Sequence, residues 1–336
     1  MSKLLIFFFI FNFLLFIYYL PLSKKFNLFD YPDYIRKFQK FPIPLVGGLF
    51  IIINLILFFI FDFILNLNSY SSLINLDSKL VFITISFLFF LLGYFDDKKN
   101  LNANTKFAIM IILILATLFF DRNALLKDMR LTFFNSSINL GKFSFLITIL
   151  CFLLFINAFN MLDGINGQAI TYVFFILIIF LLNNIFTNLV LLLLMTCFFL
   201  FILNIQNKIY LGDSGSLTLG FIISFIFLNS FNVNSSFFAD EVFLIMCIPG
   251  YELLRLTVIR ILKKVNPFAP DRSHIHHLII RKFSFVKTFV LIQLLIIFPY
   301  ISYLIINNFY ISFILSLVTY TLVIFIFSKN DKKIIK

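Results

Sequence analysis

The stretch Asn157-Ala-Phe-Asn160-Met-Leu-Asp163-Gly164-Ile-Asn166-Gly167-Gln168 separates two long apolar runs, residues 143–156 and 169–182. One carboxylate and three asparagines are costly beside lipid, so the cluster is a candidate functional site. A purely structural double turn is the alternative, because Asp-Gly and Asn-Gly are turn signals. That alternative does not account for Asn157 and Asn160, which precede both turns.

The composition of the chain decides its class. Hydrophobic residues make up 62% of the 336 residues and charged residues only 12%. A soluble chain of this size has to wet its exterior, so this composition predicts an integral membrane protein. Apolar runs near the ~20 residues that span a bilayer recur throughout. We expect one all-α membrane domain over residues 1–336, with about eleven transmembrane helices. The expected spans are residues 4–22, 43–65, 79–95, 105–120, 143–159, 168–182, 188–205, 216–232, 241–262, 286–306 and 308–328.

The basic residues are distributed unevenly around these spans. Several lysines and arginines follow the first run, at 24–25 and 36–40, whereas only Lys3 precedes it. The positive-inside rule therefore predicts an N-terminus outside and a cytoplasmic C-terminus. The net charge of +12 suits anionic lipid or a phosphorylated substrate. Nucleic acid is not an expected partner, because no soluble basic domain is visible. The outside connection at 121–142 is expected to hold a short hairpin or a surface helix.

Two further expected cytoplasmic loops have carboxylates in patterns that suggest a ligand site. The first contains Asp96-Asp97-Lys98-Lys99 and, further on, Lys106. Adjacent carboxylates repel each other, so this pair favours a site that holds Mg²⁺ and phosphate, with a solvated loop as the alternative. The second reads Gly212-Asp213-Ser214-Gly215-Ser216, where glycine lets the backbone approach a phosphate and serine can cap the next helix. A capped helix start without a ligand is the alternative.

All three histidines lie in one further loop, as His274, His276 and His277, after Pro267-Phe-Ala-Pro270-Asp271-Arg272. Zinc is a poor fit, because no cysteine accompanies them and Arg272 is adjacent. Cationic donors to a diphosphate or a sugar suit the basic surroundings better. Another loop pairs Pro42 and Pro44 with Gly47-Gly48, which predicts an extended approach to a closely packed helix start.

Carboxylates, amides and cationic groups on one face of a helical bundle are typical of Mg²⁺-dependent phosphoryl transfer. At this point the chain resembles the polyprenyl-phosphate N-acetylhexosamine-1-phosphate transferases of glycosyltransferase family 4. The resemblance covers about residues 30–285. It rests on the double aspartate at 96–97, the Asn-x-x-Asn-x-x-Asp-Gly segment at 157–164, the Gly-Asp-Ser-Gly-Ser loop at 212–216 and the His-x-His-His loop.

The resemblance implies transfer of a sugar 1-phosphate from a UDP-N-acetyl sugar to undecaprenyl phosphate, with release of UMP, at the cytoplasmic face of a bacterial inner membrane. It implies Asp213 as the Mg²⁺ ligand, with Mn²⁺ left open as a substitute, and Asp96 and Asp97 as catalytic groups at the lipid phosphate. The implied substrate-binding residues are Asn157, Asn160, Asp163, Asn166, Asn204, Tyr210, Lys106, Arg272, His274, His276 and His277, with Arg36 and Lys37 as secondary candidates. A homodimer is left open.

The chain departs from the family pattern at three positions. Asn166 replaces an aspartate, Gln39 replaces a histidine, and Glu252 replaces an aspartate. The lead-in to the histidines resembles the branch that initiates O-antigen, teichoic acid or other surface glycans. Two alternatives stay open: the phospho-N-acetylmuramoyl-pentapeptide transferase branch of peptidoglycan synthesis, and a multi-pass transporter or flippase. A transporter would favour repeated halves, and no repeat is visible.

Overall fold

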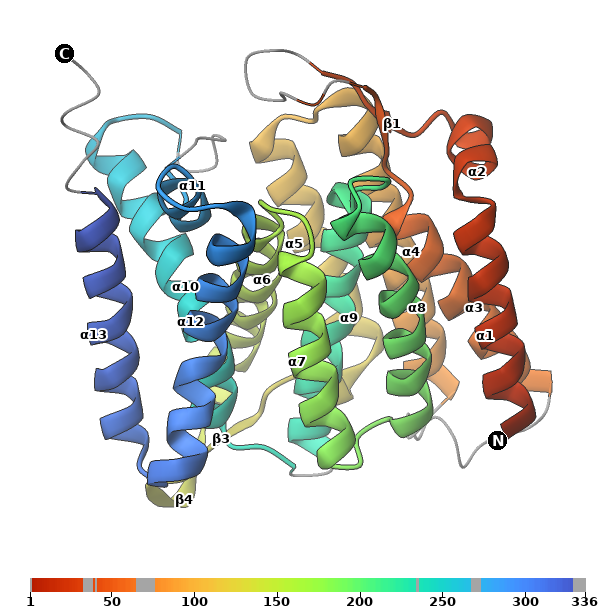
Figure 1. Ribbon diagram of the computed structural model, residues 1–336. Coiled ribbons are helices and arrows are strands. Elements are labelled where there is room, and N and C mark those ends of the chain that lie inside the picture. The colour runs from red at the N-terminus through yellow and green to blue at the C-terminus, as the bar shows by residue number, and fades with distance from the viewer. Residues whose placement is uncertain are drawn as a thin grey trace. The chain divides into compact units, whose positions relative to one another are not determined.

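The computed structural model describes residues 2–32, 39, 41–64, 76–233, 236–266 and 273–328, and nearly all of its secondary structure is helical (Figure 1). Two antiparallel strand pairs complete it: β1 (Phe29–Asp30) with β2 (Ile43–Pro44), and β3 (Asp128–Leu131) with β4 (Phe134–Asn139). The helices are α1 (Ser2–Ile17), α2 (Tyr19–Phe26), α3 (Gly47–Ile64), α4 (Leu76–Lys99), α5 (Ala103–Phe120), α6 (Ser144–Leu162), α7 (Gln168–Leu182), α8 (Thr187–Ile205), α9 (Gly212–Val233), α10 (Ala239–Leu262), α11 (Ile275–Ile280), α12 (Phe285–Ile306) and α13 (Phe309–Ser328).

The expectation of a helical membrane protein is confirmed. Within the described residues, nine helices are long and apolar enough to cross a bilayer. Two other expected spans differ from a straight crossing helix. Residues 168–182 form α7, which has 15 residues, and the first run is bent by 68° between α1 and α2. Pro21 explains the bend, because it has no N–H for the Ile17 carbonyl and its ring crowds that oxygen.

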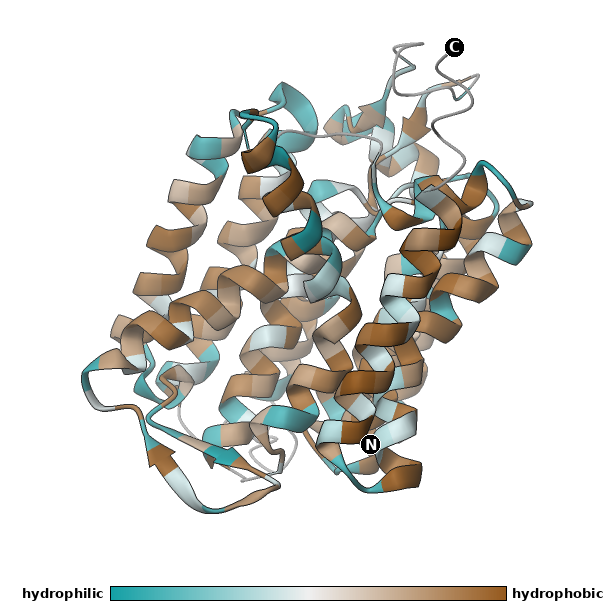
Figure 2. Cartoon of the chain, turned by 90° about the vertical axis from the view of Figure 1, so that its left-hand side faces the viewer, coloured by the Kyte–Doolittle hydropathy of each residue, from teal (hydrophilic) through white to brown (hydrophobic). Residues whose placement is uncertain are grey.

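The hydropathy of the helices fits a lipid surround. Figure 2 shows long brown helical stretches, with teal concentrated in connections and near helix ends. Many large apolar side chains point away from the protein, and Leu182 and Ile305 are each 78% exposed. Such exposure is unfavourable in water and favourable in hydrocarbon, so these side chains are suited to face lipid.

The chain divides into two compact units, described separately here. The first comprises residues 1–126 and 143–236, and α9 is its central helix, packed against α3, α4 and α6. Every residue of α9 from Ser214 to Phe231 is buried. A helix buried on all sides needs neighbours all round, so α9 fixes how the surrounding helices are arranged.

Glycines let two helices, α3 and α4, approach the start of α9 closely. A Cβ added at Gly93 of α4 would lie 2.4 Å from the Ser214 backbone nitrogen, and one at Gly48 of α3 would lie 2.5 Å from the Ser214 carbonyl carbon. Contacts this short leave no room for a side chain, as in other membrane helices packed through small residues. The close helix start expected from Gly47-Gly48 is therefore confirmed, and Gly93 plays the same part on α4.

Away from this seam, α1 is joined to α3 by a buried amide pair. Asn12 and Asn54 each donate from Nδ2 to the Oδ1 of the other, at 2.9 and 3.0 Å. Each also donates to a carbonyl one turn back in its own helix. Both amides are thus satisfied in an apolar setting, which holds the two helices at one relative height.

The second unit comprises residues 127–142 and 237–336, of which the structure describes 127–142, 237–266 and 273–328. Its helices α10, α12 and α13 pack against one another, and the single-turn α11 packs on α12 and α13. β3 and β4 form a hairpin, which confirms one of the two alternatives expected for residues 121–142. Asp240 of α10 accepts hydrogen bonds from the backbone nitrogen and the hydroxyl of Thr132 at the hairpin turn.

Candidate active site

The first unit gathers three of the predicted loops at the start of α9. Asp97, at the end of α4, turns toward α9 and caps it from outside the helix. Its Oδ1 accepts from the Asp213 nitrogen at 2.8 Å and its Oδ2 from the Ser214 nitrogen at 3.0 Å. A carboxylate is well placed there, because the first N–H groups of a helix have no partner within the helix and carry partial positive charge. Asp97 thereby fixes the backbone of Asp213.

A second line of contacts joins Asp96, Lys106 and Asp213. Lys106 Nζ, on α5, lies 2.6 Å from Asp96 Oδ2 and 3.3 Å from Asp213 Oδ1. The other oxygen of Asp96 accepts from the Leu101 nitrogen at 2.8 Å, which ties down the turn between α4 and α5. Lys106 offsets the repulsion between two carboxylates that would otherwise resist being brought together.

Asn160, near the end of α6, completes the cluster. Its Nδ2 donates to Asp213 Oδ1 at 2.5 Å and to Ser216 Oγ at 2.7 Å. The side chain of Asp213 is 35% exposed, whereas those of Lys106 and Asp96 are 16% and 9% exposed. Asp213 is therefore the carboxylate of this cluster that a ligand reaches most easily, and its neighbours hold it in place.

The donor set of this cluster fits Mg²⁺. Mg²⁺ is usually held by one or two carboxylates, with water and substrate phosphates filling the other positions. Asp213 offers a partly exposed carboxylate, and Asp96 lies within hydrogen-bonding reach of it. Among the described residues, no three or more His, Cys, Asp or Glu side chains are placed to form a complete metal cage. A magnesium ion here would thus depend on the substrate for part of its coordination.

Asp163 follows α6 and lies within the field of the same carboxylates. Burial raises its pKa to about 7, and the negative charges of Asp213 and Asp97 act in the same direction. Asp163 therefore changes protonation state near neutral pH, unlike an ordinary surface aspartate. The motif gives no hint of this, because the effect comes first from burial in the folded protein and then from carboxylates on α4 and α9.

Asn204 joins two loops of the site. Its Oδ1 accepts from the Gly167 nitrogen at 2.5 Å, and its Nδ2 donates to the Ile209 carbonyl at 2.9 Å. The side chain is buried, so it holds the 163–168 turn against the 206–211 loop. Asn166 makes a surface contact between the same loops, from its Nδ2 to Asn207 Oδ1 at 2.6 Å. Both amides thus lie where the two loops meet.

Two further predicted residues have contacts that leave their roles open. Asn157 donates from Nδ2 to the Leu153 carbonyl of its own helix at 2.7 Å. Tyr210 is half-buried, and its backbone nitrogen donates to the Pro44 carbonyl at 2.9 Å. Burial, together with the nearby charge of Asp30, raises the pKa of the Tyr210 phenol. Neither contact tests binding of a nucleotide.

The histidine segment belongs to the second unit. His276 is buried, and its ring centroid lies 4.3 Å from that of His277 and 5.3 Å from that of His274. Burial lowers the pKa of His276 well below its usual range, and the neighbouring imidazoles add to the shift. His276 is therefore neutral at physiological pH. Arg272, with the rest of 267–272, and Arg36 and Lys37 lie outside the described residues.

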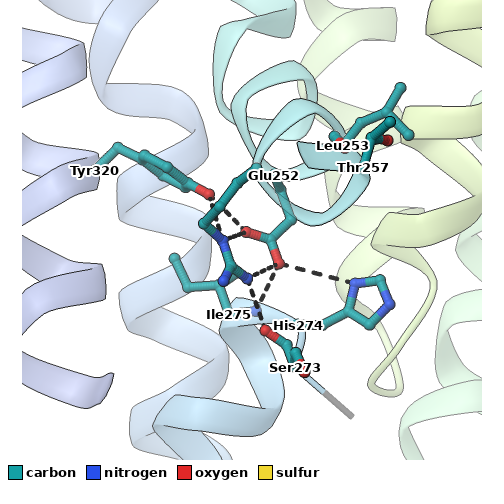
Figure 3. A network of polar contacts seen from close by, with 8 residues as sticks. Glu252, Leu253, Thr257, Ser273, His274, Ile275 and Tyr320 are labelled. Atoms are coloured by element: carbon teal, nitrogen blue, oxygen red, sulfur yellow. Dashed lines mark hydrogen bonds and ion pairs between the residues drawn. The ribbon is translucent and has the colours of Figure 1, made fainter. Parts of the chain in front are cut away.

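Glu252 and Arg255 of α10 organise the start of this segment (Figure 3). Arg255 Nη2 lies 2.8 Å from Glu252 Oε1, which also accepts from the Ile275 nitrogen at 2.8 Å. The hydroxyl of Tyr320, on α13, donates to Glu252 Oε2 at 2.6 Å. The sequence marks Glu252 only as a departure from a pattern. Arg255 lies three positions from Glu252, a spacing at which helical side chains meet, but the sequence gives no sign of Tyr320, which lies 68 positions away.

The structure brings the predicted site residues together in part. The loops around Asp96–Asp97, Asn160–Gly167 and Asn204–Ser216 do meet in one place. Ser216 belongs to that place as well, through its bond to Asn160, although the sequence offers it only as a helix cap. The histidines form a separate cluster within their own unit.

Comparisons with known proteins agree with the motif-based resemblance. Residues 79–231, which span α4 to α9 and the loops that meet there, match the model of glycosyl transferase family 4. Undecaprenyl-phosphate alpha-N-acetylglucosaminyl 1-phosphate transferase of Escherichia coli O157:H7 is 28% identical over 312 residues, covering 85% of this chain and 78% of that protein.

Relatives from other bacteria give similar figures. The enzyme of the same name from Yersinia pestis is 27% identical over 318 residues, covering 88% of this chain and 81% of that enzyme. A probable undecaprenyl-phosphate N-acetylglucosaminyl 1-phosphate transferase of Bacillus subtilis is 28% identical over 265 residues, covering 76% and 70%. The resemblance to glycosyl transferase family 4 indicated by the motifs is confirmed.

Proposed function

We propose that this relative of glycosyl transferase family 4 transfers an N-acetylhexosamine 1-phosphate from a UDP-sugar to undecaprenyl phosphate. The main observation in support is the cluster of Asp96, Lys106, Asn160 and Asp213 at the start of α9. This cluster lies within the matched family segment, in a chain similar to enzymes named for undecaprenyl phosphate. The product would initiate a cell-surface glycan.

The reaction moves one phosphoryl group. An oxygen of the lipid phosphate attacks the phosphorus that carries the sugar, and the bond between that phosphorus and the bridging oxygen of the diphosphate breaks. A lipid-linked sugar diphosphate forms, and UMP leaves with the bridging oxygen. The second pKa of a phosphate monoester is about 6, so the acceptor is largely dianionic at pH 7 and needs no strong base. The protein has mainly to position the partners and stabilise negative charge.

Lys106 and Asp213 supply the electrostatic part of this scheme. Lys106 Nζ is held between two carboxylates, and its fixed positive charge would stabilise the transferred phosphoryl group. Asn160 orients Asp213 by donating to its Oδ1. Asp213, with Asp96, would hold Mg²⁺, and Mn²⁺ would be a substitute. When bound, the ion would neutralise charge on the diphosphate oxygens.

We assign Asp97 a positioning role in place of the catalytic role that the motif suggested. Both of its carboxylate oxygens accept backbone N–H groups of α9, which holds the carboxylate against the start of that helix. Asp96 keeps the catalytic role beside Lys106. This assignment rests on the capping geometry alone.

The remaining residues are proposed as substrate contacts. Asn157, Asp163, Asn166 and Tyr210 would serve the nucleotide, with the Tyr210 ring against uracil, and Asn204 would hold together the two loops that carry them. A partly protonated Asp163 could donate to a uracil carbonyl as well as accept from a ring N–H. The sugar and its diphosphate would be bound by Arg272, His274, His276 and His277.

The proposed setting is a bacterial inner membrane, with the site on the cytoplasmic face. A UDP-sugar is a cytosolic donor, and the basic loops predict that the site faces the cytosol. The same rule gives the N-terminus outside and the C-terminus inside. A homodimer is compatible with this arrangement and is not required by it.

The test is UMP release by the full-length protein in membranes supplied with undecaprenyl phosphate, Mg²⁺ and a panel of UDP-N-acetyl sugars. We expect release with at least one N-acetylhexosamine donor, and at least about a 100-fold loss in Asp213→Asn. Asp77→Asn, an exposed carboxylate at the start of α4, is the matched control and should keep full activity.

Two outcomes would contradict the proposal. Absence of UMP release across the panel from folded protein would exclude the reaction. Near-normal turnover by Asp213→Asn would exclude the role of Asp213. A further arm with UDP-N-acetylmuramoyl-pentapeptide separates the surface-glycan reaction from the peptidoglycan branch, which alone would use that donor.

A further inference from the structure

We propose that Tyr320, on the last helix α13, is a positioning residue for the histidine segment and acts through the Glu252–Arg255 pair. The proposal rests on the proposed function only in giving the histidines a part in the reaction. α13 lies beyond the residues matched by the family model, which end at 231. The inference therefore extends the working part of the protein to its last described helix.

Glu252 and Arg255 form hydrogen bonds to the backbone on both sides of His274. Glu252 Oε1 accepts from the Ile275 nitrogen at 2.8 Å, and Arg255 Nη2 donates to the Ser273 carbonyl at 2.6 Å. One peptide group before His274 and one after it are thus both held by side chains of α10. His274 itself has the extended conformation that precedes a helix, with φ −63° and ψ 147°. Its backbone direction is set by these two bonds.

Tyr320 in turn fixes the orientation of the pair. Its hydroxyl donates to Glu252 Oε2 at 2.6 Å and accepts from Arg255 Nε at 3.1 Å. The same hydroxyl therefore contacts both members of the pair, and Figure 3 shows Tyr320 pointing toward Glu252. Glu252 and Tyr320 are 7% and 5% exposed. In such a site an ion pair is stable only when its remaining hydrogen-bonding positions are filled.

Loss of this hydroxyl should move the histidines without separating α10 from α13. Without it, Glu252 Oε2 keeps only its bond from Arg255 Nε at 3.1 Å, so neither Glu252 nor Arg255 is tied to α13 and the pair holds the backbone around His274 less firmly. A second polar link joins the same two helices, where the Tyr251 hydroxyl lies 3.0 Å from Ser316 Oγ. The Tyr251 and Tyr320 rings also pack together, with centroids 5.5 Å apart. Helix packing is thereby maintained by contacts other than the one removed.

The chain offers a direct readout of the histidine segment. All three histidines of the sequence lie in it, so the rate at which diethyl pyrocarbonate modifies histidine reports on this segment alone. The experiment compares wild type, Tyr320→Phe and Tyr251→Phe as full-length protein in detergent. Tyr251→Phe is the matched control, because it removes a hydroxyl that joins α10 to α13 but does not touch Glu252.

We expect Tyr320→Phe to increase the modification rate several-fold and to lower kcat/KM for UMP release about tenfold, the size of one hydrogen bond to a charged group. Tyr251→Phe should change neither by more than about twofold. A modification rate in Tyr320→Phe equal to that of wild type, or an equal increase in both variants, would overturn the proposal. The modification assay needs no turnover, so a failure of the proposed reaction is distinguishable from a failure of this inference.

A double-mutant cycle gives an independent check. If Tyr320 acts through Glu252, the increase in histidine modification in Tyr320→Phe/Glu252→Gln should match that in Glu252→Gln alone. In Glu252→Gln the carboxylate through which Tyr320 acts is already absent. Multiplication of the two single effects would contradict the proposal. The result holds even if each variant loses some thermal stability.

Discussion

The two polar clusters of this protein are built in opposite ways. The carboxylate cluster at the start of α9 depends on helices that approach without side chains, since glycines of α3 and α4 meet the α9 backbone directly. The histidine segment of the second unit is a helix of 6 residues held by a network of three side chains. The first depends on close main-chain contact in addition to its side-chain bonds, whereas the second depends on hydroxyl, carboxylate and guanidinium groups.

This difference predicts different weaknesses. Adding an atom should damage the first cluster most, because its helices have no space between them. Removing an atom should damage the second, because a buried network loses a partner. Three experiments test this contrast, in order of decreasing effect.

The largest effect is expected from Gly93→Ala. The new Cβ would lie 2.4 Å from the Asp213 oxygen and from the Ser214 nitrogen, so α4 and α9 would have to separate. We expect loss of nearly all UMP release and a clear fall in thermal stability. Gly250→Ala is the control, because nothing lies within 4 Å of the Cβ it would add. Equal tolerance of both substitutions would refute the close approach of α4 and α9.

An intermediate effect is expected from Asp97→Asn. An amide can accept from only one of the two N–H groups that Asp97 holds, and its NH₂ would face the other. The unpaired buried N–H should cost about 1–3 kcal/mol of unfolding free energy. Asp96→Asn is the comparison, because its oxygen can still accept from the Leu101 nitrogen.

Thermal unfolding and turnover separate these two aspartates. Asp97→Asn should lower the melting temperature more than Asp96→Asn, and Asp96→Asn should lose turnover while staying well folded. The reverse order of melting temperatures would remove the argument that Asp97 is the cap and Asp96 the catalytic group.

The smallest effect is a pH dependence from His276. Its pKa is lowered in the folded protein by burial and by the neighbouring imidazoles, so the folded state holds it neutral. The unfolded chain takes up a proton as pH falls below about 6.5. Stability from this group is therefore complete above about pH 6.5 and is lost as pH falls toward the folded pKa, by at most about 1.4 kcal/mol per pH unit.

The measurement is thermal unfolding of wild type and His276→Gln between pH 7.5 and pH 5.5. Wild type should lose stability on acidification more steeply than the variant, which has no imidazole to protonate at that position. Parallel curves would show that His276 is not held neutral by its surroundings.

The sequence predicted the membrane class and the meeting of three loops, because hydropathy and motif order are local properties. It did not predict which oxygen of which aspartate caps α9, since that depends on how α4 ends relative to another helix. The bend after Ile17 was missed although Pro21 stood in the sequence, because length and hydropathy outweighed it. Tyr320 carried no local signal. Its partner Glu252 stands out in the sequence only because the family pattern has an aspartate at that position. The contacts of Glu252 with the Tyr320 hydroxyl and the Ile275 nitrogen account for the longer side chain.

Burial of α9 on every side bears on the order in which the protein is made. This helix carries Ser, Thr and Asn side chains, and 83% of its apolar window is buried inside the protein, so it has almost no surface that suits lipid. During synthesis α3, α4 and α6 enter the membrane before it and have to leave room for it. A chain stopped before residue 212 would lack the helix against which Phe82, Phe89 and Phe152 pack. The central helix of this unit is therefore synthesised after three of the helices that surround it, and their final packing has to wait for α9.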